Sequence, residues 1–190
     1  MPDDAAPIFI WAPGMSSLPL PANVGMRAGK TPEGADSPSI RYVLLQVHYD
    51  NPSLDPDQYD SSGVRFYMTP KMVTHEAGIL STVVIQTTIS IPPRRNETQV
   101  WGYCPSNQTS HFPHPLHVFA SNPHAHKYAR KVWTEHWRDG KRIDVINPHA
   151  NFDFNDQKLY YIDKVIQPGD ELYMHCIYDT SDTVRLFFFF

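Results

Sequence analysis

The stretch Leu116–His126, LHVFASNPHAH, begins as an apolar strand and ends in a His-X-His pair, His124-Ala125-His126. Side chains of an extended strand alternate between two faces, so the two imidazoles are expected on the same face. Two imidazoles at this spacing can chelate one metal ion. His117, in the same stretch, is a further candidate. The spacing alone fits equally well two solvated or hydrogen-bonded histidines.

The composition around this stretch is that of a β protein. Apolar runs rich in Ile, Val, Thr, Tyr and Phe are separated by 18 prolines. This pattern favours short strands with proline-rich connections, and no segment of useful length shows the 3.6-residue period of a helix. We therefore predict an all-β fold. A chain of 190 residues is long enough for one large domain or two small ones.

Apolar alternation predicts where the strands lie. The clearest is Arg41–Asp50, RYVLLQVHYD, with His48 on the face opposite its expected core residues Val43, Leu45, Val47 and Tyr49. Further strands are predicted over residues 64–69, 78–91, 99–104, 117–120, 126–137, 142–146, 158–166 and 171–178. Asp139-Gly140 is expected to form a hairpin turn. Pro70–Glu76 interrupts the pattern, which places a candidate domain boundary near residue 75.

Charge and targeting signals exclude some functions. The net charge is -4 without a basic stripe, which argues against nucleic acid as a partner. No apolar run reaches the ~18 residues of a transmembrane helix, and the start MPDDAAPIFIWAPG lacks the features of a signal peptide. Asn96 and Asn107 stand in glycosylation sequons. Whether Cys104 and Cys176 pair with each other is left open by the sequence.

A series of motifs resembles the copper type II, ascorbate-dependent monooxygenases, in the branch of the dopamine and tyramine β-hydroxylases. The resemblance extends from about Trp11 to Arg185. Its motifs, in order, are YVLLQVHYDNP (42–52), DSSGVRFYMT (60–69), AGIL with IPP (77–80 and 91–93), GYC (102–104), HVFAS..HAH (117–126), FDFN.Q (152–157) and PGDEL...C.Y.T.D (168–182).

This resemblance implies a core of two domains, each an antiparallel β-sandwich of jelly-roll type holding one copper. Residues 1–75 would end the first, electron-transfer domain, and residues 76–190 would form most of the second, oxygen-binding domain. The implied reaction is hydroxylation of a C–H bond in a small, phenylethylamine-type amine by dioxygen, with ascorbate as electron donor. The implied location is a secretory vesicle or the extracellular space, and a homo-oligomer is left open.

The resemblance also implies roles for individual residues. His48 matches the third ligand of the electron-transfer copper. His124 and His126 match two ligands of the oxygen-binding copper, which makes His124 a catalytic position, and His117 matches a histidine beside that site. Cys104 and Cys176 match disulfide cysteines of the family, with partners elsewhere rather than with each other.

Each implied copper site is incomplete in this sequence. There is no His-His dipeptide, no histidine precedes His48, and Met174 is a poor substitute for the methionine ligand expected after residue 182. Ser81 stands where the amine hydroxylases carry an acid, and Pro123 precedes His124 where the family has a non-proline residue. We therefore expect a truncated copy of the core that folds marginally and is inactive alone.

Two other interpretations stay open. The chain would be a secreted β-sandwich binding module derived from the family and without catalytic activity, or its His124 and His126 would bind adventitious zinc. Metal analysis separates the three: copper supports the enzyme, no metal the binding module, and zinc the third interpretation.

Overall fold

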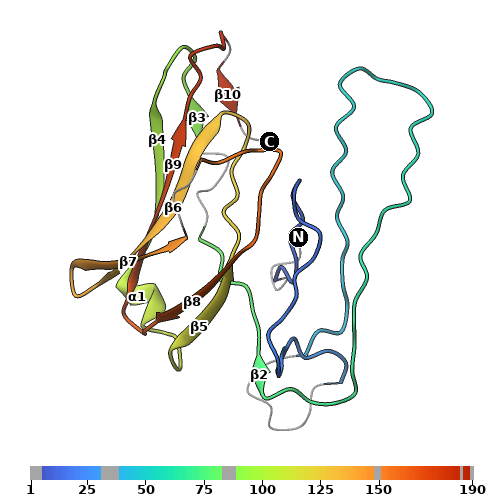
Figure 1. Cartoon of the computed structure of the whole chain (residues 1–190), viewed down its shortest axis with the longest axis vertical. Helices are drawn as coiled ribbons and strands as arrows, with labels where there is room; N and C mark the ends of the chain where they lie inside the picture. The colour runs from blue at the N-terminus through green and yellow to red at the C-terminus, as the bar shows by residue number, and fades with distance from the viewer. Residues whose placement is uncertain (1–5, 31–38, 83–88, 148–150, 185, 189–190) are drawn as a thin grey trace. The chain divides into compact units, whose positions relative to one another are not determined.

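A computed structural model of the chain describes residues 6–30, 39–82, 89–147, 151–184 and 186–188. The chain separates into two compact units. The first, called the sheet unit below, consists of Met1–Pro19 with Ile79–Phe190, and the second, called the loop unit, of Leu20–Gly78. Figure 1 shows that the long strands belong to the sheet unit, whereas the loop unit is mostly irregular.

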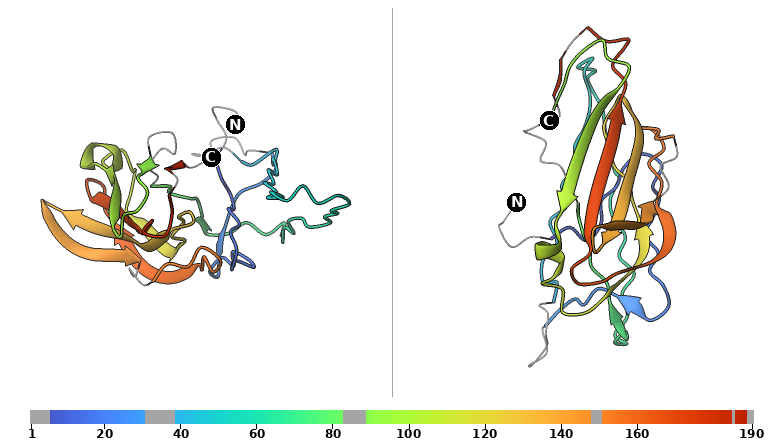
Figure 2. Two further views of the ribbon diagram at one scale, coloured as in Figure 1. Left: turned by 90° about the horizontal axis from the view of Figure 1, so that it is seen from above. Right: turned by 90° about the vertical axis from the view of Figure 1, so that its left-hand side faces the viewer.

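Within the described residues, the main sheet of the sheet unit has four strands in the order β4-β9-β6-β7, each antiparallel to its neighbours. They lie side by side in Figure 2. Their bounds are Thr98–Cys104 for β4, Glu171–Tyr178 for β9, Ala129–Arg138 for β6 and Lys141–Asn147 for β7. The alternation along β9 buries Leu172, Cys176 and Tyr178, because strand side chains point alternately to the core and away from it.

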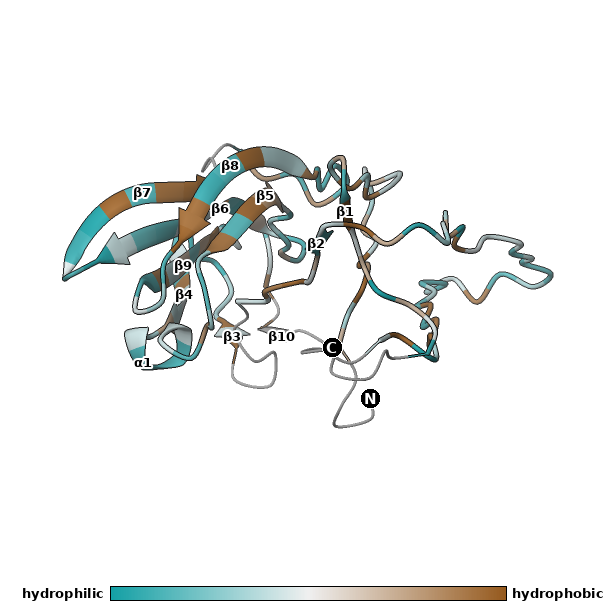
Figure 3. Cartoon of the chain, turned by 90° about the horizontal axis from the view of Figure 1, so that it is seen from below, coloured by the Kyte–Doolittle hydropathy of each residue, from teal (hydrophilic) through white to brown (hydrophobic). Residues whose placement is uncertain are grey.

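A second layer packs against this sheet. β5 (Leu116–Ser121) and β8 (Tyr160–Ile166) form an antiparallel pair. Bands of hydrophobic and hydrophilic residues alternate along both strands (Figure 3). Ile166 of β8 and Leu172 of the main sheet are buried in one apolar cluster, which Leu116 of β5 joins. The strands therefore enclose a core between two layers, and the predicted all-β, antiparallel sandwich is confirmed.

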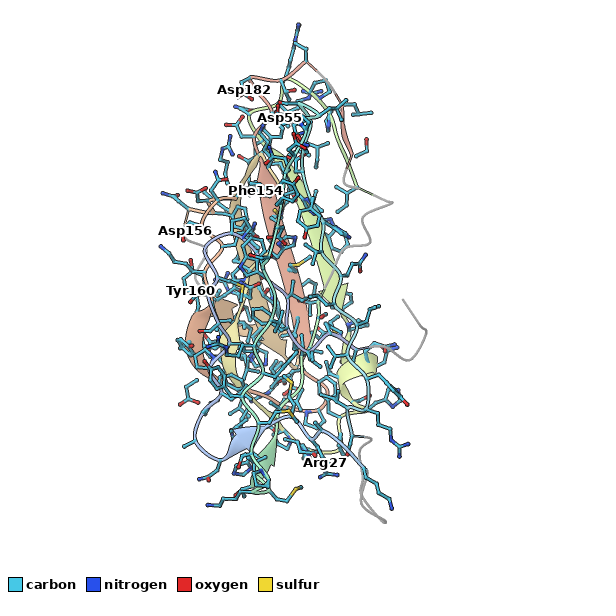
Figure 4. All side chains as sticks on the ribbon, turned by 90° about the vertical axis from the view of Figure 1, so that its right-hand side faces the viewer. Arg27, Asp55, Phe154, Asp156, Tyr160 and Asp182 are labelled. Atoms are coloured by element: carbon cyan, nitrogen blue, oxygen red, sulfur yellow. The ribbon has the colours of Figure 1, made fainter. Side chains whose placement is uncertain are left out.

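Shorter elements complete the two units. β3 (Ser90–Ile91) pairs with β10 (Phe187–Phe188), and the one-turn helix α1 (Ser106–Thr109) follows β4. In the loop unit, β1 (Val24–Gly25) and β2 (His75–Glu76) form a short parallel pair. Arg27, labelled in Figure 4, forms a 2.7 Å salt bridge with Glu76 beside this pair.

Most strands predicted after residue 98 are confirmed to within a few residues. The strand predicted over 126–137 begins later, at Ala129, because residues 127–128 form a turn. The Asp139-Gly140 hairpin turn is confirmed, and both residues have the positive φ that a type I′ turn requires (51° and 70°). The predicted strand over 78–91 falls partly on residues 83–88, which lie outside the described part, and its last two residues form β3.

The two strands predicted in the loop unit, Arg41–Asp50 and 64–69, are wrong. Residues 41–70 form a long irregular loop that contains no strand (Figure 1). This loop is called the excursion below. The expected core face is exposed, with Val43 at 51% and Leu45 at 56% of full accessibility. Alternation creates a sheet face only when a neighbouring strand accepts the backbone hydrogen bonds and a second layer covers the side chains, and the described residues supply neither here.

A buried polar network ties the β8–β9 turn to the main sheet. Asp170 is 1% exposed, and its carboxylate accepts two hydrogen bonds from Arg138 (2.6 and 2.8 Å) and contacts His136 Nε2 at 2.6 Å. The backbone N–H of Gln167 also donates to this carboxylate, at 2.7 Å. Burial alone would raise the pKa of Asp170, but the hydrogen bonds from Arg138 and His136 outweigh it and lower the pKa to about 2.

In the part of the chain that the structure describes, no helix has the length and apolar character needed to cross a membrane.

Candidate metal centre

The His-X-His segment lies between β5 and β6, at the start of the longest strand of the main sheet. Residues 122–126 make no strand pairing, so the prediction that these histidines stand on a β-strand is wrong in its hydrogen bonding. The alternation of side chains is nevertheless present. Ala125 is 4% exposed and belongs to the core cluster with Val132 and Cys176, whereas His124 is exposed and His126 half-buried. The small Ala125 side chain thus anchors the segment with a histidine on either side.

Contacts on the backbone hold the segment in place. The N–H of Ala129 donates to the carbonyl of His126 at 3.1 Å, which closes a turn into β6. Tyr128 in that turn has a positive φ of 78°, and its carbonyl accepts the N–H of Asp179 at 2.9 Å. The His126 backbone also hydrogen-bonds the hydroxyl of Tyr178, a buried core residue of β9. These hydrogen bonds therefore fix the backbone next to the histidine pair to the main sheet.

The two imidazoles are close enough to share a metal ion. Their ring centroids are 5.2 Å apart, with the planes at 69°. A metal held about 2.0 Å from one nitrogen of each ring at a near-tetrahedral angle would set the ring centres roughly 5 Å apart. Burial, and secondarily the neighbouring His124, lower the pKa of His126, so its ring favours the neutral form that binds metals. The residues present therefore fit two nitrogen ligands of one ion.

Gln157 supports the first of these histidines. Its Oε1 lies 2.7 Å from Nδ1 of His124, and its own Nε2 donates to the carbonyl of Phe154 at 2.9 Å. Gln157 is 2% exposed, although it belongs to the irregular segment that precedes β8. Its backbone N–H donates to the carbonyl of Pro13 at 2.7 Å, so the N-terminal segment closes over this loop.

The loop that carries Gln157 packs tightly on that N-terminal segment. Gly14 has a φ of +93°, and a Cβ there would stand 2.9 Å from the backbone N of Gln157 and from Cα of Asp156. Only glycine fits such a position without displacing the loop. Gln157 also lines a pocket, together with residues that include Pro123, Asp153, Asp156, Lys158 and Tyr160. Asp156 and Tyr160, two of these lining residues, are labelled in Figure 4.

The other predicted metal-site residues lie elsewhere. His48 is exposed on the excursion of the loop unit, where its Nε2 contacts Gln46 at 3.0 Å. His117 is exposed on β5, opposite Val165 of β8, and its role beside the site stays a prediction. Met174 stands within β9, opposite Gly102 of β4. The described residues contain no cluster of three His, Cys, Asp or Glu side chains that could hold a metal ion.

The structure gives the positions of the two cysteines and of the two sequon asparagines. Cys104 and Cys176 are free thiols, and the β4–β9 register sets them apart, with Cys104 opposite Leu172. Burial raises the pKa of both thiols, that of Cys176 to about 11. A disulfide to a cysteine elsewhere stays a prediction, as does glycosylation at Asn96 and Asn107, both of which are exposed.

Sequence reasoning missed two parts of this region. Gln157 was visible only as the last residue of the FDFN.Q motif, and nothing local indicated that it reaches His124, 33 positions earlier. The His136–Asp170 contact joins residues 34 positions apart. A buried pair of that separation leaves no periodic signal in the sequence, because it depends on how β6 and β9 are aligned.

Comparison with known proteins then places the chain. Residues 75–188 match the family model described as copper type II ascorbate-dependent monooxygenase, C-terminal domain. Tyramine beta-hydroxylase of Caenorhabditis briggsae is 33% identical over 177 residues, which is 91% of this chain and 29% of that protein. Human dopamine beta-hydroxylase is 34% identical over 177 residues, 90% of this chain and 28% of that protein.

A third relative, the human DBH-like monooxygenase protein 1, is 34% identical over 187 residues, which is 94% of this chain and 30% of that protein. The chain therefore spans less than a third of the length of these curated relatives.

Proposed function

The chain belongs to the copper type II ascorbate-dependent monooxygenases, and from this premise we propose that His124 and His126 hold the copper at which that family activates dioxygen. The observation that carries the proposal is the pair of imidazoles 5.2 Å apart over the buried Ala125. Copper bound there would supply dioxygen activation, with electrons from ascorbate. Imidazole suits copper in both oxidation states, so the pair fits an ion that must cycle between them.

The chain's own residues would bind the metal and hold its histidine ligands in position. Ala125 fixes the segment in the core, and Gln157 holds His124 from behind. The closure of the segment around Pro13 and Gly14 keeps Gln157 out of water, which strengthens its hydrogen bonds. These contacts pre-organise the two nitrogen donors, so little ordering is left to occur when the metal binds.

For the second copper of the family, we propose that His48 is a ligand of the electron-transfer site. Its exposure on the excursion leaves its ring accessible, but the described residues contain no group of three His, Cys, Asp or Glu side chains that could complete a site there. We therefore expect the 190-residue chain to bind copper at His124 and His126 and not to turn over substrate by itself.

The proposed substrate is a small amine of the phenylethylamine type, hydroxylated at a C–H bond, with dioxygen and ascorbate as co-substrates. Support comes from relatives whose names refer to tyramine and dopamine. We also propose a secretory-vesicle or extracellular location with glycans on Asn96 and Asn107, supported by the exposure of both side chains.

A binding module without catalytic activity is the second candidate function. The observation in its favour is that the described residues contain no group of three His, Cys, Asp or Glu side chains placed to hold a metal. Adventitious zinc at the histidine pair would be a third outcome. All three candidates give different metal contents.

The test is copper reconstitution of the purified 190-residue chain followed by metal analysis. We expect nearly one strongly bound copper, which His124→Ala and His126→Ala remove because a single imidazole does not chelate. His111→Ala is the matched control, since His111 is also exposed but lies before β5. Unchanged copper in His124→Ala would overturn the site, zinc in preference to copper would favour the third outcome, and no metal would favour the binding module.

A further inference from the structure

We propose that Gln157 is the positioning residue of His124, and that its carboxamide keeps the ring proton on Nδ1 so that Nε2 alone is offered to the metal. This rests on the proposed function for the metal, but the state of the ring is a property of the chain itself. The contact between Gln157 Oε1 and His124 Nδ1, at 2.7 Å, is the starting observation.

The direction of that hydrogen bond follows from the chemistry of the amide. A carboxamide oxygen only accepts hydrogen bonds, so Nδ1 of His124 must carry the proton and donate. The neutral imidazole has one proton, and its other nitrogen then has the free lone pair. The metal-binding nitrogen of a histidine is set in this way by the hydrogen bond that its other nitrogen makes.

The amide cannot turn over and reverse this assignment. Its Nε2 donates to the carbonyl of Phe154 at 2.9 Å. A flipped amide would place its oxygen against that carbonyl and its NH₂ against Nδ1, which would lose the first hydrogen bond and demand the opposite tautomer of His124. Both ends of the Gln157 side chain therefore support one orientation.

The burial of Gln157 stabilises this arrangement of hydrogen bonds. Gln157 is 2% exposed, so water does not compete for its polar atoms. A buried amide group without a hydrogen-bond partner would lower the free energy of unfolding. Its backbone is fixed by the 2.7 Å hydrogen bond from its N–H to the carbonyl of Pro13. The acceptor that His124 meets is thus part of the folded sheet unit and is in place before any metal arrives.

A neutral acceptor at this position has a consequence for the metal. A carboxylate would draw the Nδ1 proton more strongly and make the ring a better donor to the oxidised ion, whereas an amide does so weakly. Gln157 should therefore favour the oxidised ion less than a carboxylate would. This separates its role from simple packing, which would be insensitive to the charge of the acceptor.

The experiment compares the wild-type chain with Gln157→Leu and Gln157→Glu. First, the tautomer of His124 is read in the metal-free chain by long-range proton–nitrogen NMR at about pH 8, where an ordinary imidazole is neutral. We expect the Nδ1-protonated form in the wild type and a mixture in Gln157→Leu. A dominant Nε2-protonated form in the wild type would overturn the inference, and because no metal is present, this result would not bear on the proposed function.

Second, copper affinity and the reduction potential are measured on the same variants. We expect Gln157→Leu to weaken copper binding 10- to 100-fold, the usual cost of losing such a partner. Gln157→Glu should retain copper and shift its potential downward. Gln99→Leu is the matched control, because Gln99 contacts His175 at 3.1 Å on the main sheet, and it should leave both values unchanged.

If Gln157→Leu fails to fold, the reduction potential of Gln157→Glu and the His124 tautomer of the wild type still test the positioning role. A folded Gln157→Leu with wild-type affinity, or a Gln157→Glu potential equal to that of the wild type, would overturn the positioning role. Loss of copper from the wild type together with the expected tautomer would instead reject the proposed function and leave the assignment of the ring intact.

Discussion

Two histidine-bearing stretches of this chain have similar strand-like alternation and very different surroundings. His124 and His126 flank an alanine that is 4% exposed in the core of the sheet unit. His48 follows an equally regular alternation in Arg41–Asp50, yet its neighbours Val47 and Tyr49 are 47% and 71% exposed. The first stretch is held by packing and hydrogen bonds from several elements, whereas the described residues show no such support for the second.

The difference shows what a metal-ligand motif requires beyond its residues. A histidine becomes a pre-organised ligand when its backbone is fixed and its second ring nitrogen is engaged by a buried acceptor. His124 has both, through Ala125 and Gln157. The hydrogen bond that the described residues give the His48 ring is to Gln46, two positions away in the same exposed segment. We expect variants in the sheet unit to have large effects and matched variants in the loop unit to have small ones.

The largest expected effect is that of Asp170→Ala. This substitution leaves the buried His136 and the paired Arg138 without their carboxylate, and breaking a buried ion pair from one side costs about 3–5 kcal/mol. We expect the lower end of that range, because the Arg138 side chain is 38% exposed and water can solvate it. Unfolding in urea, followed by tryptophan fluorescence, measures the loss. All 4 tryptophans (residues 11, 101, 133 and 137) belong to the sheet unit, so the signal reports on that unit.

The matched control is Asp60→Ala in the loop unit. Asp60 also accepts a hydrogen bond, from Tyr49 at 2.7 Å, but both side chains are exposed. Water replaces such a contact, so we expect the tryptophan-monitored transition to be unchanged. Equal losses in Asp170→Ala and Asp60→Ala would show that the excursion stabilises the sheet unit, and the contrast between the two stretches would then be mistaken.

How much of this the sequence could predict depended on the range of the interactions. The strand Glu171–Tyr178 was predicted because its alternation follows directly on a Pro-Gly turn. The histidine pair was found because its spacing is local. The strand expected at Arg41–Asp50 failed because alternation says nothing about which strand will pair with it. Gln157 was missed because its contact with His124 arises only when the loop before β8 folds onto Pro13.

A smaller effect should appear on acidification. The pKa of Asp170 is about 2 in the folded chain, below the value of about 3.9 of an ordinary aspartate, so the folded state holds its charged form more strongly. The stabilisation, about 2 kcal/mol, is present above pH about 4 and is lost as the pH falls towards 2. Urea unfolding at about pH 7 and about pH 2.5 measures it.

Asp170→Asn is the control for this pH dependence. It lacks the titrating group, so its stability should fall less between the two pH values than that of the wild type. Asp144 and Glu135, whose pKa values are also lowered, remain in both proteins and cancel in the difference. An acid-induced loss of the same size in both proteins would rule out Asp170 as the cause.

The smallest expected difference is between two glycine variants with similar backbones. Gly14 and Gly29 have φ values of +93° and +101°, so alanine is strained at both positions. At Gly14 the added Cβ would also stand 2.9 Å from backbone atoms of Asp156 and Gln157, whereas nothing lies within 4 Å at Gly29. We expect Gly14→Ala to lower the tryptophan-monitored stability at least roughly 1 kcal/mol more than Gly29→Ala, because its backbone strain and the shift of the Gln157 loop both fall in the sheet unit, whereas Gly29 belongs to the loop unit. The same shift should loosen the hold of Gln157 on His124, so the His124 tautomer should become mixed in Gly14→Ala and stay uniform in Gly29→Ala. A uniform tautomer in both variants would mean that the loop absorbs the added methyl without moving Gln157, and the N-terminal segment would then stabilise the sheet unit without contributing to the order of the metal site.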